Sequence, residues 1–163
     1  MLQDDFKALL WSYGGNLGSG TGRVDPEAAK HPELFLLAAS NFIALDARIA
    51  NCVFNVVIEI VFTLSHQALE EKMRTNGYDA RRLGVLVSVI RDELNRRGSP
   101  ADAERWGVIE SNLRKKLDTT KSTKPFISHL PCLPGRHDPI FLAWGFEYPG
   151  IVREPKKYLR KAV

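Results

Sequence analysis

The sequence predicts a mainly α, single-domain protein, and three observations lead to this prediction. Apolar residues recur at helical spacing through most of the first 118 residues, and capping residues separate those runs. A chain of 163 residues is also long enough to bury a core without disulfides or a structural metal. We expect an N-terminal helix and glycine-rich loop (1–31), a helical core (32–118) and a proline-rich basic segment (119–163).

The N-terminal part predicts two short helices separated by a glycine-rich loop. Asp4 or Asp5 can cap the first helix. Its apolar residues follow the i, i+3, i+4, i+7 spacing, and they are Phe6, Leu9, Leu10 and Tyr13. The loop over 14–23 lacks the Lys-Ser/Thr ending of a P-loop and follows a helix, so we predict no nucleotide site there. Asp25 and Pro26 then supply the N-cap and first residue of the second helix.

The stretch over 32–64 is almost continuously apolar and predicts one long helix, or two abutting helices, surrounded by protein. Residues 56–64 are rich in β-branched side chains, and a buried strand is the alternative there. Asp46, Arg48 and Glu59 interrupt the run, and each charge costs about 2.5–3.5 kcal/mol at the middle of a bilayer. We therefore expect a buried core and no membrane partner.

One polar stripe runs along this helical stretch. Arg48, Asn51, Asn55 and Glu59 fall within an arc of about 80° on a helical wheel. The stripe is either a solvent-facing strip or an interaction seam that meets another subunit or a ligand.

Three helices follow, and each begins at a capping signal. Ser65 caps a helix over 66–75, and Asp79 caps a longer helix over 79–97 that ends before Gly98. Ser99 and Pro100 then supply the N-cap and first residue of another helix. Its apolar residues are Trp106, Ile109, Leu113 and Leu117.

The last segment has a different character, because six of the nine prolines lie between 125 and 155. Short extended pieces around 139–146 and 150–154, joined by a Pro149-Gly150 turn, predict a small β-hairpin. Residues 154–162 predict a final turn or two of basic helix.

Charge is divided unevenly along the chain. Residues 1–70 hold four Lys/Arg against eight Asp/Glu, a net charge of −4, whereas residues 71–163 hold nineteen against eleven, a net charge of +8. A basic excess on one part of a chain indicates an anionic partner. The cations form three clusters in the sequence, at 81–97, 114–124 and 153–161.

The helices expected over 46–61, 66–75 and 79–97 resemble a helix-turn-helix arrangement in their spacing. In that arrangement the third helix enters the major groove, where Arg81 and Arg82 reach phosphates or guanine edges, and Arg91 lies further along it. The competing interpretation is that these arginines are solvated on the outer face of an ordinary helix. A helix rather than a β wing follows, which disfavours a winged helix.

The C-terminal segment interleaves aromatic and basic residues. Aromatic rings that stack on bases, next to cations that bind phosphates, are typical of nucleic-acid surfaces. The rings are Trp144, Phe146, Tyr148 and Tyr158, and the cations include Arg153, Lys156, Lys157, Arg160 and Lys161. The alternative is that the rings pack on the core and leave the lysines in water.

Neither a metal site nor a catalytic centre is predicted. His129, Cys132 and His137 give an H-x2-C-x4-H pattern that lacks a fourth ligand and a CxxC pair, so we expect a loop and no metal. Cys52 and His66 lack a third, orienting group, so we expect no nucleophile and more generally no enzyme. No cofactor is predicted.

Two cysteines and an acidic N-terminus without the pattern of a signal peptide indicate a cytoplasmic protein with reduced thiols. The leading hypothesis is a regulatory or accessory nucleic-acid-binding protein that contacts DNA or RNA through one set of cations. That set is Arg81, Arg82, Arg91, Lys156, Lys157 and Arg160. The alternative is a helical protein-interaction module without catalytic activity, as a homodimer or with a protein partner, that uses the polar stripe or the Trp106 face.

Overall fold

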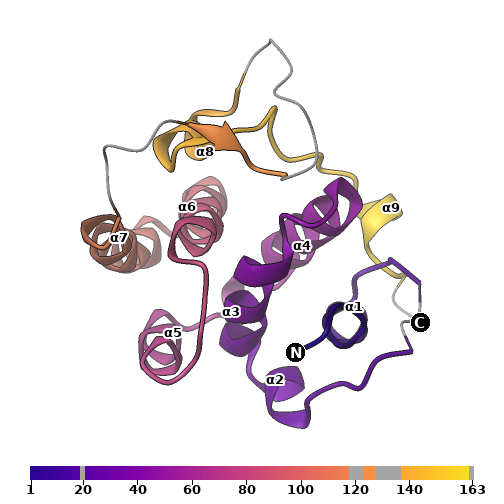
Figure 1. The fold of residues 1–163 in the computed structure, drawn as a ribbon. Coiled ribbons are helices and arrows are strands. Elements are labelled where there is room, and N and C mark those ends of the chain that lie inside the picture. Colours follow the sequence, from indigo (N-terminus) through magenta and orange to yellow (C-terminus); the bar gives the residue numbers. More distant parts are fainter. Residues whose placement is uncertain (19–20, 118–122, 128–136, 162–163) are drawn as a thin grey trace.

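The computed structural model describes residues 1–18, 21–117, 123–127 and 137–161, and it confirms the mainly α fold (Figure 1). The helices of the first part are α1 (Gln3–Ser12), α2 (Pro26–Lys30), α3 (Pro32–Phe42), α4 (Ala47–Glu59) and the short 3₁₀ helix η1 (Val61–Thr63). They are followed by α5 (His66–Met73), α6 (Ala80–Arg96), α7 (Pro100–Lys115), α8 (Pro139–Ala143) and α9 (Pro155–Tyr158). Two short strands, β1 (Lys124–Pro125) and β2 (Phe146–Glu147), pair in parallel.

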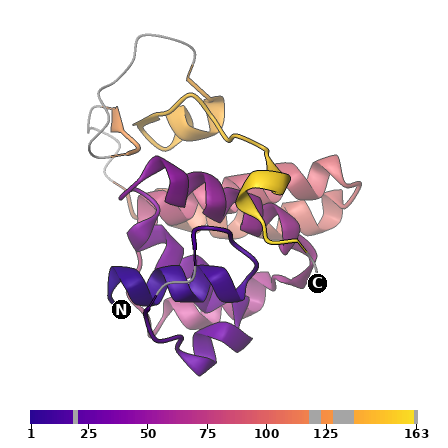
Figure 2. The ribbon, with the colours of Figure 1, turned by 90° about the vertical axis from the view of Figure 1, so that its right-hand side faces the viewer.

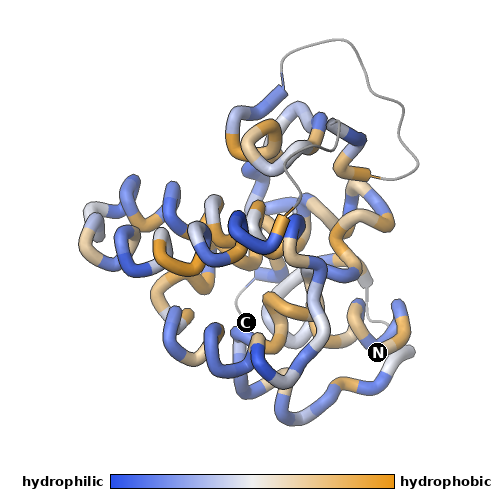
Figure 3. Tube along the Cα trace, turned by 60° about the vertical axis from the view of Figure 1, so that its left-hand side comes forward, coloured by the Kyte–Doolittle hydropathy of each residue, from blue (hydrophilic) through white to orange (hydrophobic). Residues whose placement is uncertain are grey.

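Helices α3, α4 and α6 form the centre of the molecule. α3 packs against α1, α2, α5 and α6, and α4 packs against α6 and α9. α6 and α7 are joined by only three residues and pack along each other as a helical hairpin. The middle of α4 is buried on all sides, with Val53, Phe54, Val56 and Val57 at 0 % exposure. Hydrophilic and hydrophobic residues alternate along the outer helices, as Figure 3 shows.

The apolar run over 32–64 forms two helices rather than one. α3 ends at Phe42, and α4 starts after Asp46, whose carboxylate accepts hydrogen bonds from the backbone N–H groups of Arg48 and Ile49. This N-cap explains the break, because a carboxylate bonded to the first free N–H groups starts a new helix. Residues 56–59 are helical, so the strand alternative is wrong there.

The capping signals of the later helices are confirmed in part. Ser65 Oγ accepts from the N–H of Ala68, and the Asp79 carboxylate accepts from the N–H of Arg82 at 2.9 Å. Ser99 precedes α7 without a side-chain cap. α1 begins at Gln3, one residue before the expected caps, so Asp5 lies in its first turn and accepts from the N–H groups of Leu2 and Arg23.

The predicted C-terminal β-hairpin is wrong. Residues 139–143 form α8, which begins after Asp138, whose carboxylate accepts from the N–H of Ile140 at 2.8 Å. β2 pairs in parallel with β1, which precedes the proline-rich residues 128–136 in the sequence. Local aspartate capping and the burial of aromatic side chains outweigh the extended tendency of this stretch.

Residues 123–127 and 137–148, which include β1, α8 and β2 and which we call the C-terminal layer, are attached to the helical core through aromatic rings. Phe141 of α8 lies 5.5 Å from Phe54 of α4, 5.0 Å from Phe126 and 4.7 Å from Tyr148, measured between ring centroids. Phe126 also contacts Phe146 at 5.1 Å. The layer is therefore part of the hydrophobic core and not an appendage.

Residues 151–160, which we call the strap, run from this layer across α4 to α1 (Figures 1 and 2). The strap ends in a β-bridge between Leu159 and Gly15, and the N–H of Arg160 donates to the carbonyl of Gly14. The final helical turn expected over 154–162 is present as α9.

No helix in the described part of the chain is long and apolar enough to cross a bilayer.

Candidate nucleic-acid interface

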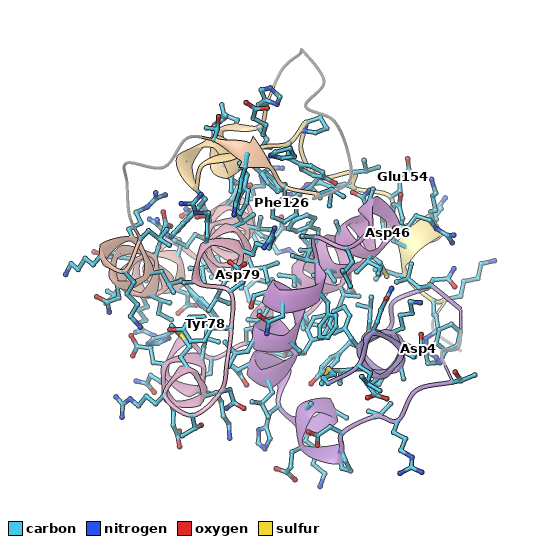
Figure 4. The ribbon with its side chains drawn as sticks, in the orientation of Figure 1. Asp4, Asp46, Tyr78, Asp79, Phe126 and Glu154 are labelled. Atoms are coloured by element: carbon cyan, nitrogen blue, oxygen red, sulfur yellow. The ribbon has the colours of Figure 1, made fainter. Side chains whose placement is uncertain are left out.

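The N-terminal end of α6 is held in place by α3 and by its own cap. The N–H of Asp79 donates to Ser40 Oγ of α3 at 3.0 Å, and the carboxylate of Asp79 forms an ion pair with Arg82 at 2.6 Å. These contacts fix the position of Tyr78, just before the helix, and of Arg81, just inside it. Figure 4 shows Tyr78 and Asp79 where the connection from α5 enters α6.

Cations from several elements converge at this end of the α6–α7 hairpin. The side chains of Arg81, Arg82 and Lys124 lie 5.8, 5.3 and 5.7 Å from the centroid of the Phe146 ring. The Arg114 guanidinium lies over the Trp144 ring at 4.1 Å. Lys116 donates from Nζ to the Tyr78 hydroxyl at 3.0 Å.

The same surface continues into a groove between α5 and α7. The groove has a volume of about 320 Å³, with Met73 and Ile109 as apolar lining and Arg74, Asn112, Lys116 and Glu70 as polar lining. Lys116 belongs to both the groove and the Tyr78 contact, so the two features adjoin. We call this surface the basic face, and it consists of Arg74, Arg81, Arg82, Arg114, Lys116 and Lys124.

Carboxylates compensate some of these cations. Arg82 pairs with Asp79, and Arg114 pairs with Glu110 at 3.1 Å. Burial alone would raise the pKa of Glu110, but hydrogen bonds from Arg91 and Arg114 outweigh it and lower the pKa. Within the described ranges, Arg74, Arg81 and Lys116 form no ion pair. The outward charge of the basic face therefore rests mainly on these three side chains.

The residues of the leading hypothesis do not form one site. Arg81 and Arg82 belong to the basic face, but Arg91 is bound to α7, where its Nε donates to the Ala103 carbonyl and its guanidinium pairs with Glu110. Lys156, Lys157 and Arg160 lie in the strap beside α4 and α1, on the opposite side of the molecule from α7 (Figures 1 and 2).

The cations of the strap have contacts of their own within the fold. Arg153 pairs with the buried Glu93 of α6 at 2.7 Å, and Arg160 lies over the Trp11 ring at 4.3 Å while donating to the Trp11 carbonyl. Lys157 pairs with Glu154 at 3.5 Å, and this carboxylate raises the pKa of Lys157. Lys156 is exposed.

The polar stripe, which was one candidate for an interaction seam, divides into buried and exposed parts. Asn55 Nδ2 donates to the carbonyl of Val152 at 2.8 Å, and Asn51 Oδ1 accepts from the N–H of Val152 at 3.3 Å. Both asparagines are buried, whereas Arg48 and Glu59 are exposed. The middle of the polar stripe thus binds the strap of the same chain, and the two ends of the stripe face solvent.

Three helices form where the helix-turn-helix resemblance was expected, as α4, α5 and α6, and α5 packs on α3 and α7. Trp144 lies directly on Gly84 of α6, where an added Cβ would come within 2.4 Å of the indole ring. Trp144 also donates from Nε1 to Ser88 Oγ at 2.8 Å. The N-terminal half of α6 is thus covered on this side by the C-terminal layer.

The groups considered for metal binding and catalysis have clear placements where they are described. Cys52 is buried and donates to the carbonyl of Tyr158 at 3.3 Å, and burial raises the pKa of its thiol to about 11. No group of three His, Cys, Asp or Glu side chains within the described ranges is placed to hold a metal. His129 and Cys132 lie outside the described residues.

Sequence reasoning did not select Tyr78, Arg74, Arg114, Lys116 or Lys124 as site residues. One available signal was the short α6–α7 connection: two helices of 17 and 16 residues joined by three residues return the end of the second to the start of the first. Arg114 and Lys116 therefore had to lie close to Arg81.

Comparison of the chain with protein-family models, curated proteins and solved structures gave no match in any of the three.

Proposed function

We propose that this protein is a nucleic-acid-binding accessory or regulatory protein and that the basic face is its contact surface. The observation that carries this is the convergence of five cations on the rings of Tyr78, Trp144 and Phe146, with a sixth, Arg74, in the adjoining groove. Clustered cations on a fixed framework neutralise successive phosphates, because each contact releases condensed counterions.

Contacts within the fold restrict two of these cations, Arg114 and Arg81, and this restriction supports the role. Arg114 donates to the Ala143 carbonyl at 2.7 Å, and Gly145 adopts a left-handed conformation (φ +75°) with its Cβ position 3.3 Å from Arg81 Nη1. A side chain at Gly145 would therefore press on Arg81. Holding the cations in place in advance lowers the entropy lost when phosphates bind.

Fluorescence anisotropy with labelled DNA and RNA tests this function. We expect binding at low salt that weakens steeply between about 50 and 200 mM salt. The logarithm of the association constant should fall linearly with the logarithm of the salt concentration, with a slope of about 0.7–0.9 for each phosphate contact. Arg81→Gln, which leaves the ion pairs of the fold untouched, should reduce that slope by one contact. The absence of binding to any DNA or RNA at low salt contradicts the function.

The second candidate is a helical protein-interaction module, as a homodimer or with a protein partner. A groove of about 260 Å³ between η1 and α7, lined in part by Phe62, Leu64 and Trp106, favours it, and the Phe62 side chain is 58 % exposed. Large exposed apolar side chains are common at protein interfaces. Light scattering on the purified protein separates the two: a stable dimer that dissociates on Phe62→Ser and has no nucleic-acid affinity supports the module.

A further inference from the structure

Helix α6 does not present the free outer face that a groove-reading helix needs. The C-terminal layer covers one side of its N-terminal half through Trp144, which contacts Gly84 and donates to Ser88. α7 covers another side, where Arg91 is bound to Ala103 and Glu110. A helix reads duplex DNA by inserting side chains deep into a major groove about 12 Å wide. The arginines at the start of α6 instead belong to a surface shared with other elements.

That surface carries flat groups suited to stacking. The half-buried Tyr78 ring lies among the cations, with the Lys116 ammonium 5.8 Å from its centroid and bound to its hydroxyl. The Arg114 guanidinium rests on the buried Trp144 ring, and 41 % of the Arg114 side chain remains exposed. Aromatic rings and guanidinium planes stack on unpaired bases, whose faces are free, and not on bases inside a duplex.

The groove between α5 and α7 offers a place for a base next to these groups. Its apolar lining comes from Met73 and Ile109, and Asn112 supplies an amide that can both donate and accept hydrogen bonds. Arg74 and Lys116 also line it, and their positive charge complements a backbone passing along the groove. Only a strand whose bases are unpaired can place a base in such a groove while its phosphates remain in contact with the cations.

We infer that the basic face binds single-stranded polynucleotide in preference to duplex, with Arg74, Arg81 and Lys116 contacting phosphates and Tyr78 or the Arg114 plane stacking on a base. The inference rests on the proposed function and narrows its ligand to RNA or DNA with unpaired bases. Charge complementarity and partly exposed stacking groups on one surface favour this ligand over an acidic protein.

The test compares three probes by fluorescence anisotropy: a labelled single-stranded oligonucleotide, made as RNA and as DNA, the duplex of the same sequence, and labelled heparin. The decisive variant is Tyr78→Leu, which keeps an apolar side chain but removes the ring, and its matched control is Tyr78→Phe, which keeps the ring. We expect Tyr78→Leu to weaken single-strand binding by at least about fivefold, the effect of losing one base–ring stack. Duplex and heparin binding should stay unchanged, and Tyr78→Phe should retain most of the single-strand affinity.

A second variant keeps the test valid if Tyr78→Leu disturbs the fold. Arg114→Lys retains the charge but loses the guanidinium plane over Trp144, so it should weaken single-strand binding more than duplex binding. Equal or tighter binding of duplex, or equal losses for all three probes, would overturn the single-strand inference while leaving nucleic-acid binding intact. Binding of heparin alone would overturn both.

Discussion

The strap and the basic face are both rich in cations, yet the structure uses those cations differently. In the strap, Arg153 pairs with Glu93 of α6 and Arg160 lies over the Trp11 ring of α1. These charges therefore attach the strap to α6 and α1. On the basic face, Arg81 and Lys116 contact aromatic rings and pair with none of the described carboxylates. Basic composition alone therefore does not identify an interface, because many of the charges have partners inside the fold.

The largest expected effect concerns the C-terminal layer that joins these two regions. Phe141→Ala should destabilise the protein by about 3–5 kcal/mol, because it opens a cavity among Phe54, Phe126 and Tyr148. Leu142→Ala, one residue on and 43 % exposed, should change stability by less than about 0.5 kcal/mol. Urea unfolding measures both, and equal effects would mean that the layer is not part of the core.

Removing the buried carboxylate of Glu93, which binds Arg153 of the strap, should have the next largest effect on stability. Glu93→Gln should cost about 1.5–3 kcal/mol, because the carboxylate accepts hydrogen bonds from both Arg97 and Arg153. Asp92→Asn is the matched control: Asp92 is 40 % exposed and should contribute no more than about 1 kcal/mol through its surface pairs. If Asp92→Asn lowered the free energy of unfolding as much as Glu93→Gln, the role of Glu93 in attaching the strap would be contradicted.

The contribution of Glu93 to stability depends on pH. Burial alone would raise the pKa of Glu93, but the hydrogen bonds from Arg153 and Arg97 outweigh it, and the folded-state pKa lies below its ordinary value of 4.5. This contribution to stability is therefore fully present well above pH 4.5 and is lost as the pH falls through the lower folded-state pKa. Unfolding curves measured across this range should converge for wild type and Glu93→Gln at acid pH. If the difference in unfolding free energy between wild type and Glu93→Gln were the same at every pH, the charged hydrogen bonds would be excluded as the source of that difference.

A smaller effect distinguishes the buried and exposed parts of the polar stripe. Asn55→Ala should destabilise by about 1–2 kcal/mol, because it removes hydrogen bonds to the carbonyls of Val152 and Asn51. Arg48→Ala, at the exposed end of the same stripe, should stay within about 0.5 kcal/mol of wild type. Thermal unfolding tests this, and hydrogen exchange at the N–H of Val152 shows whether the strap loosens first. Equal stability of the two variants would contradict a stabilising role for the hydrogen bonds of Asn55 to the strap.

Local signals in the sequence were sufficient for much of the fold. Asp25, Ser65 and Asp79 cap the helices that they were expected to cap, because a cap acts on N–H groups two or three residues away. The hairpin was mispredicted because the position of residues 139–148 depends on rings from α4 and from residue 126.

The candidate site shows the same division between local and distant information. The proximity of Arg114 to Arg81 follows from helix lengths and a short connection, both readable from the sequence. The role of Asn55 was not readable, because its partner Val152 lies 97 residues away. The position of Tyr78 beside Lys116 depends on how α5 packs on α7, which no local pattern specifies.

The most direct test compares two double variants that each remove two cations from one region. Arg81→Gln with Lys116→Gln removes two cations of the basic face. Lys156→Gln with Lys161→Gln removes two exposed lysines, one in the strap and one directly after it, that pair with no described carboxylate. For a single-stranded oligonucleotide, we expect the first pair to lower the magnitude of the salt slope by about 1.4, or about 0.7 per phosphate contact, and the second to leave it unchanged. An equal or larger reduction for the strap pair would contradict the assignment of the interface to the basic face.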